Sequence, residues 1–183
     1  MKTFTYAFFI MLVIGCGMWG CEKAASYPDT PEIHFKGLEV KIDGADPLGE
    51  KIKSAYLSFS FIDGDGDLGV RDVNSRDTVS KIHYTWMKKL DDGTYEPYVY
   101  ETGITTDAIR IPYDEDVMNK DEAHNKFLKG TMDIKLTIPY GSSIAGMDTI
   151  RIEFFIVDRA DHKSNVDITP DFSILADSVK VSR

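Results

Sequence analysis

The chain has 183 residues, 30 of them acidic and 21 basic, which gives a formal net charge of −9 at pH 7. This acidic balance argues against nucleic acid as a partner, because phosphate backbones are bound mainly through Lys and Arg. The length suits one domain with a substantial hydrophobic core, and two cysteines exclude a fold held by several disulfides.

Residues 1–20 are predicted to be an export signal. The segment 4–14 is almost entirely apolar, which matches the hydrophobic part of a signal peptide, and it is too short to span a bilayer core of about 30 Å. Cys16 and Cys21 follow closely, each preceded by glycine. A small residue before a cysteine at this place is typical of a bacterial lipoprotein signal, in which the cysteine is acylated and becomes the first residue of the mature chain.

The choice between the two cysteines is open. Val-Ile-Gly before Cys16 matches a lipobox better than Met-Trp-Gly before Cys21. Cleavage at Cys21, however, starts the mature chain with a polar, proline-containing stretch, whereas cleavage at Cys16 leaves Gly-Met-Trp-Gly ahead of it. We expect lipidation at Cys21, with Cys16, or an ordinary secretory signal, as the alternatives. Residues 21–31 are then a lipidated flexible tether, residues 32–183 form the domain, and no disulfide remains.

From Ile33 onward, apolar and polar residues alternate with a period of two, which is typical of strands with one buried face. Asp92-Gly93 lies between two such segments and predicts a hairpin turn. The expected strands cover 33–42, 54–62, 81–90, 94–101, 106–111, 131–138, 149–157 and 172–181.

Strands at this spacing, without helices between them, predict an all-β fold: an antiparallel Ig-like sandwich of seven to eight strands. The charged segment 114–128 is the one candidate for a helix. We expect it to be an ordered loop with a single helical turn.

The loop after the second expected strand is rich in carboxylates. Asp63, Asp65 and Asp67 alternate with glycines, whose conformational freedom lets a loop curl tightly. Calcium prefers six to eight oxygen ligands, whereas three close carboxylates without a cation repel one another. The loop is not an EF-hand, because Leu68 and Asn74 occupy the positions that hold Gly and Glu there.

A second oxygen-rich loop, after the strand at 149–157, is predicted to complete a calcium site. If both strands point the same way, Asp158, Asp161 or Asn165 faces the aspartate loop, because loops at one end of a sandwich cluster. Two alternatives remain open. Arg159 and Lys163 could neutralise the aspartates by ion pairing, or the loop could be a solvated glycine turn.

Nothing in the sequence marks an active site. The mature chain has no nucleophile elbow, phosphate loop or cysteine nucleophile, and its histidines lack zinc-ligand spacing. Trp86, Tyr95, Tyr98 and Tyr100 lie on a predicted hairpin, where they could stack on sugars. Alternating aromatics in a strand are more often part of a core, so we expect burial.

Four segments resemble uncharacterised lipoproteins of Bacteroidetes-type bacteria. They are CEK at 21–23, YPDTP at 27–31, FIDGDGDLG at 61–69 and FIVDRADHKSN at 155–165. The last is also similar to the terminal strand and loop of bacterial immunoglobulin-like domains, from which residues 161–163 depart. The resemblance favours Cys21 and implies class and location only, since the family has no assigned activity.

The sequence therefore predicts a non-enzymatic, lipid-anchored protein of the outer membrane, on its periplasmic or its surface face. Its expected role is a binding, adhesion or assembly module with a protein or glycan partner and a structural calcium ion. The alternatives are a glycan-binding accessory protein that uses the aromatic hairpin, and a glycan-processing hydrolase that uses loop carboxylates about 5–10 Å apart.

Overall fold

The described residues form strands and loops only. The computed structural model describes residues 26–45, 47, 49, 51–69, 80–100, 102–112, 127–138, 149–175 and 178–182. Within these ranges, no helix has the length and apolarity that a membrane crossing requires. The predicted signal segment 1–20 and Cys21 lie outside the described residues.

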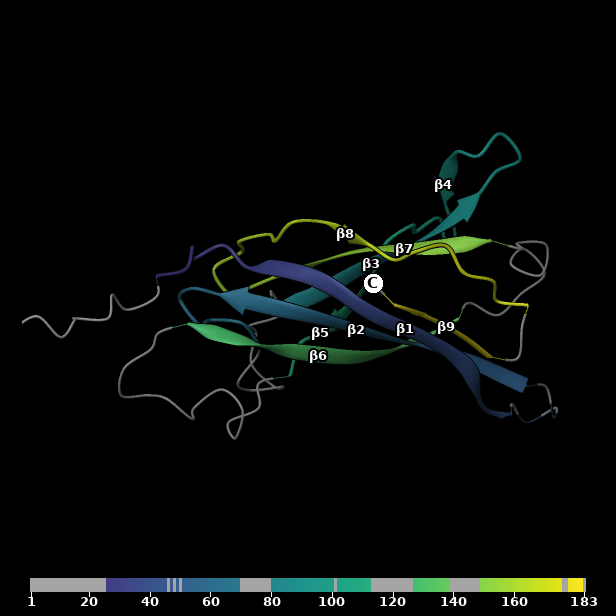
Figure 1. Ribbon diagram of the computed structural model, residues 1–183, viewed down its shortest axis with the longest axis horizontal. Coiled ribbons are helices and arrows are strands. Elements are labelled where there is room, and N and C mark those ends of the chain that lie inside the picture. Colours follow the sequence, from purple (N-terminus) through teal and green to yellow (C-terminus); the bar gives the residue numbers. More distant parts are fainter. Residues whose placement is uncertain are drawn as a thin grey trace, which may run out of the picture.

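Nine strands in the described part of the chain form two antiparallel sheets, which face each other as a sandwich (Figure 1). The first sheet has the order β6-β2-β1-β9, and the second has the order β4-β3-β7-β8, with β5 beside β4 on the same strand β3. The strands are β1 (Glu32–Ala45), β2 (Lys51–Asp63), β3 (Lys81–Lys89), β4 (Tyr95–Pro97), β5 (Asp107–Arg110), β6 (Leu128–Thr137), β7 (Ile150–Val157), β8 (Asp167–Ile168) and β9 (Ser178–Ser182).

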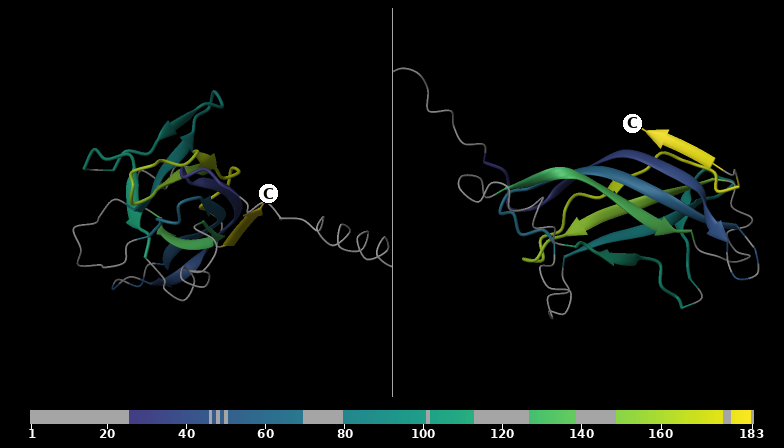
Figure 2. Two further views of the ribbon diagram at one scale, coloured as in Figure 1. Left: turned by 90° about the vertical axis from the view of Figure 1, so that its left-hand side faces the viewer. Right: turned by 90° about the horizontal axis from the view of Figure 1, so that it is seen from below.

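The strand order confirms the predicted Ig-like class. Immunoglobulin domains place strands A, B and E in one sheet and C, F and G in the other. Here β1, β2 and β6 are neighbours in one sheet, and β3, β7 and β8 are neighbours in the other. The chain crosses between the sheets from β2 to β3 and again from β6 to β7, so the two layers are interwoven (Figure 2).

The prediction of one continuous strand over 172–181 is wrong. Phe172 pairs with Ile150 in the second sheet, whereas β9 pairs with β1 in the first. The chain therefore changes sheets between these two points. The expected strand 94–101 is shorter in the structure, where β4 covers only Tyr95–Pro97, although the N–H of Tyr98 still donates to the carbonyl of Trp86 in β3 at 2.7 Å. Most of the segment 114–128 lies outside the described residues.

The predicted hairpin turn at Asp92-Gly93 is present. Gly93 has a φ of 84°, a conformation that glycine adopts without strain. The N–H of Leu90 donates to the carbonyl of Thr94 at 2.8 Å, which closes the turn. The Asp92 carboxylate accepts from the hydroxyl of Thr94 at 2.6 Å and from its N–H at 2.9 Å, and these two bonds lower the pKa of the Asp92 carboxyl.

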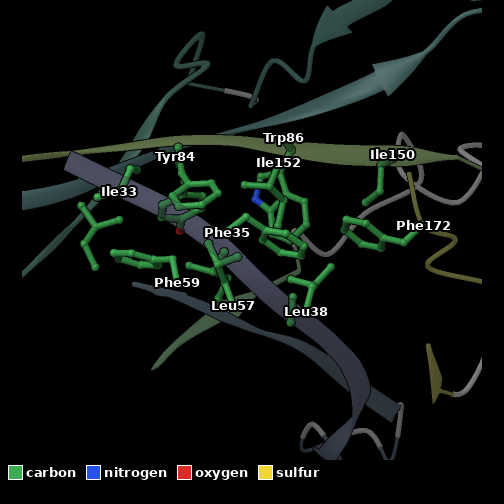
Figure 3. Packing of buried hydrophobic residues seen from close by; sticks show 14 of the residues in the cluster. Ile33, Phe35, Leu38, Leu57, Phe59, Tyr84, Trp86, Ile150, Ile152 and Phe172 are labelled. Atoms are coloured by element: carbon green, nitrogen blue, oxygen red, sulfur yellow. The ribbon is translucent and has the colours of Figure 1, made fainter. Parts of the chain in front are cut away.

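A β-bulge in β1 sets which of its residues face the core. Phe35 pairs with Phe59 and Gly37 pairs with Ser58, so Lys36 is an extra residue on β1. The inward positions consequently change from odd to even numbers at this point. Figure 3 shows the result: apolar side chains of both sheets point toward each other and fill the space between the layers.

Candidate metal centre

A buried aspartate ends one strand, β2, and another buried aspartate directly follows β7 in the opposite sheet. In β2 the inward residues are odd-numbered up to Phe61, and the same phase makes Asp63 point inward. In β7 the inward residues are even-numbered up to Ile156, and Asp158 continues that phase. Both aspartates have 0% exposed surface. Both strands run to the same end of the sandwich (Figure 1), so the two carboxylates meet between the sheets.

The aspartate loop is fixed at both ends. The side chain of Leu68 is fully buried in the core, and its N–H donates to Oδ2 of Asp63 at 3.0 Å. The N–H of Gly69 donates to Oγ of Ser80 at 2.8 Å. Gly66 and Gly69 have φ angles of 69° and 92°, which explains these two glycines. The loop therefore returns on itself and presents its carboxylates toward Asp158.

Four carboxylates form one group. Asp63, Asp65, Asp67 and Asp158 each offer an oxygen, and these oxygens all lie within 4.8 Å of one another. Two ligands of one calcium ion, bound at about 2.3–2.6 Å, can be up to about 5 Å apart. Oδ1 of Asp63 and Oδ1 of Asp67 are buried without a hydrogen-bond partner among the described residues. Such oxygens are costly to bury unless a cation or a donor satisfies them, so the residues fit a hard, oxygen-binding cation.

The group is unfavourable without a counter-charge. Burial raises the pKa of the Asp63 carboxyl to about 7, and the charge of Asp65 adds to this increase, although the hydrogen bond from Leu68 opposes it. Burial also raises the pKa of Asp67, as do the charges of Asp158 and Asp65. In the folded chain without a metal ion, these two carboxyl groups therefore hold their protons more tightly than ordinary aspartates do.

Basic side chains neutralise the group only in part. Nε of Arg159 donates to the backbone carbonyl of Asp67 at 2.6 Å rather than to a carboxylate, and Nζ of Lys163 lies 3.9 Å from the centre of the Phe155 ring. Among the described residues, the ion pair to this group comes from His162, whose Nδ1 is 3.0 Å from Oδ2 of Asp158. Burial raises the pKa of Asp67, and the charge of Arg159 opposes part of this increase. Arg159 therefore compensates the group only in part, and no ion pair joins Arg159 or Lys163 to these carboxylates among the described residues.

Two of the six predicted ligands serve other roles. Asp161 lies outside the group and has a φ of 69°, which places it at the turn of the second loop. The amide of Asn165 is engaged by β1: its Oδ1 accepts from the N–H of Ile33 at 2.8 Å, and its Nδ2 donates to the Ile33 carbonyl at 2.9 Å. Asn165 therefore joins the second loop to the start of β1.

Replacing Asn165 with alanine is expected to cost about 1–3 kcal/mol of unfolding free energy, because it removes both partners of the buried Ile33 backbone. Calcium affinity is expected to stay within about twofold of the unchanged protein, since the four carboxylates are untouched. Urea unfolding and calcium titration of Asn165→Ala measure the two effects. A large loss of affinity with normal stability would instead place Asn165 among the ligands.

Three of the four aromatic residues of the hairpin lie in the core or pack against it. Trp86 and Tyr98 are 3% and 8% exposed, and Tyr100 packs against the same cluster. Tyr95 is covered on one ring face by the guanidinium of Arg151, 3.6 Å from the ring centre. The expected burial is thus confirmed for Trp86 and Tyr98, and the hairpin offers no open aromatic platform of the kind that sugars stack on.

Gly64 meets a need different from that of the other glycines of this loop. The sequence predicts a positive φ for Gly64, as for Gly66 and Gly69, and this prediction is wrong, because Gly64 is not among the glycines with positive φ. Glycine is needed here because no room exists for a side chain: a Cβ would lie 2.2 Å from the carbonyl oxygen of Pro28. The residues at 26–31, expected to be part of a flexible tether, therefore pass directly over the aspartate loop.

Comparisons of the chain with protein-family models, with curated proteins and with solved structures found no match.

Proposed function

We propose that this chain is a lipid-anchored, non-enzymatic module of the cell envelope, for binding, adhesion or assembly, whose two sheets are joined at one end by a structural calcium ion. The observation that carries the proposal is the group of four aspartates, with two buried oxygens that lack a partner among the described residues. The predicted lipoprotein signal and tether support the anchoring.

Calcium is favoured over other cations by the donor set. All four side chains supply carboxylate oxygens, which suit hard cations and not zinc, whose sites usually include Cys or His. Magnesium demands near-ideal octahedral geometry and usually keeps several waters with only one or two carboxylates, whereas calcium accepts a larger and more flexible set of carboxylates, as a group of four provides. Asp65 is exposed and Asp67 half-buried, which leaves room for water as further ligands.

The glycan-directed alternatives have less support. Retaining glycosidases separate their two carboxyl groups by about 5–5.5 Å across an open cleft, and inverting enzymes by more. In this group, Asp63 and Asp158 have no exposed surface with which to touch a substrate. The burial of Trp86 and Tyr98 removes the sequence feature on which sugar stacking depended.

Isothermal titration of calcium into the metal-stripped full chain tests the proposed ion. One ion is expected to bind per chain, and Asp65→Asn is expected to weaken binding at least tenfold, because it removes one charged ligand from an exposed position. Asp161→Asn is the matched control: it removes the same charge from the neighbouring loop, outside the group, and should bind nearly as the unchanged protein does. Equal affinities of all three would overturn the site.

The anchor is predicted to be attached at Cys21. Mass spectrometry of the membrane form is expected to find an acylated N-terminal peptide that begins at this residue. Cys21→Ala should lose the lipid and move to the soluble fraction, whereas Cys16→Ala should remain in the membrane. A Cys21→Ala protein that still carries lipid would show that Cys16 is the modified residue.

A further inference from the structure

The first described residues of the chain are attached to the aspartate loop. The N–H of Gly64, between Asp63 and Asp65, donates to the carbonyl of Pro28 at 3.0 Å. A Cβ at Gly64 would lie 2.2 Å from the Pro28 oxygen and 2.4 Å from the Tyr27 oxygen, so the two backbones approach as closely as glycine permits. The loop thus offers a contact surface made of backbone alone.

A second contact holds the same segment from the side. The ring of Tyr27 lies edge-on to that of Phe127, just before β6, with 4.7 Å between the ring centres. Edge-to-face aromatic pairs contribute about 0.5–1.5 kcal/mol beyond their buried area. Together the two contacts fix the direction in which the chain enters β1, at the end of the sandwich where β2 and β7 terminate (Figure 2).

We infer that calcium binding at the aspartate group and docking of residues 26–31 are coupled, so that the ion orders the segment leading to the anchoring cysteine and orients the domain on its membrane. This inference rests on the proposed calcium site. Gly64 lies between two ligands, so an ion that draws Asp63 and Asp65 together also fixes the peptide that bonds to Pro28. Without the ion, repulsion among the four carboxylates opposes this arrangement of the loop, so the bond from Gly64 to Pro28 is expected to form less often.

Coupling of this kind must be reciprocal. If calcium stabilises the docked segment, then loss of docking must weaken calcium binding by the same factor. Tyr27 contributes a ring contact and no carboxylate. A change at this residue therefore reaches the ion only through the position of the segment.

The test compares the calcium affinity of three full-length chains by titration calorimetry. Tyr27→Ala is expected to bind calcium about fivefold or more weakly than the unchanged chain, within the range that is typical of coupling between sites. Thr30→Ala, an exposed change in the same segment, is the matched control and should bind normally. Hydrogen exchange across 26–31 in the unchanged chain is expected to be slower with calcium than with EDTA.

The outcomes separate the inference from the site. Normal affinity of Tyr27→Ala, together with calcium-independent exchange across 26–31, would overturn the coupling and leave the calcium site intact. No binding to the unchanged chain would overturn both. If Tyr27→Ala proves too unstable to titrate, Phe127→Ala serves instead: it removes the other ring of the pair, leaves the aspartate loop unchanged, and should also bind at least fivefold more weakly.

Discussion

At pH 8, the metal-stripped protein is expected to melt about 5–10 °C below the protein saturated with calcium. A ligand that binds only the folded state stabilises it by about 2.7 kcal/mol at a hundredfold excess over Kd. For a domain of this size, each kcal/mol corresponds to about 2–4 °C. EDTA should reverse the gain. Circular dichroism at a fixed scan rate measures it.

The calcium effect should disappear on acidification. The folded, metal-free chain raises the pKa of Asp63 to about 7, above the value of about 3.9 for an unfolded aspartate. Between these values the folded state binds more protons, so the destabilisation by this group is present above pH 7 and is relieved as the pH falls toward 4. Protons also compete with calcium. His83, whose pKa is lowered by burial, acts in the opposite direction.

Two variants separate charge from metal binding. Asp63→Asn should raise the melting temperature of the metal-free protein at pH 8, because it removes one buried charge, and should abolish the response to calcium. Asp161→Asn should behave as the unchanged protein. Identical melting curves with calcium and with EDTA at pH 8, in protein confirmed to be free of metal, would favour the solvated glycine turn.

Phe154→Ala is expected to cost about 3–5 kcal/mol of unfolding free energy, the range for large-to-small changes in a core. Phe154 has no exposed surface, and its ring lies 5.3 Å from that of Phe59 across the space between the sheets. Its loss leaves a cavity where the two layers meet. Urea unfolding measures the effect, which corresponds to a drop of roughly 6–20 °C in melting temperature.

Phe155→Ala is the matched control, because the adjacent residue in β7 faces outward. Its ring stacks on His83 at 4.8 Å and remains partly exposed, so we expect a loss of no more than half that of Phe154→Ala. Equal losses, or a larger one for Phe155→Ala, would contradict the inward phase of β7. That phase also places Asp158 in the metal group.

The strands could be predicted because each buries one face, which leaves a period of two in the sequence. The division of 172–181 could not be predicted. Phe172 and Val179 both look like strand residues, and the sheet that each joins depends on long-range pairing. The bulge at Lys36 could not be predicted for a related reason. An extra residue in one strand can be recognised only when the residues that it faces on the paired strand are known.

Part of the site was open to sequence analysis. Asp63 follows Phe61 by two residues and Asp158 follows Ile156 by two, so the strand period itself indicates that both aspartates point inward. The role of Asn165 could not be seen, because its partner, Ile33, lies 132 positions earlier in the chain. The close approach of the N-terminal segment to Gly64 could not be predicted either, because it depends on where that segment lies in the folded chain.

The meeting of Asp63 and Asp158 has a consequence for how such a domain is cross-linked. In antibody domains a disulfide joins strands B and F of the two sheets, and β2 and β7 hold the corresponding places in this topology. An ion held by their terminal aspartates would tie the same pair of strands without any thiol. Its strength would then follow the concentration of calcium around the domain and not the redox state, so a chelator could loosen the domain where a reductant could not.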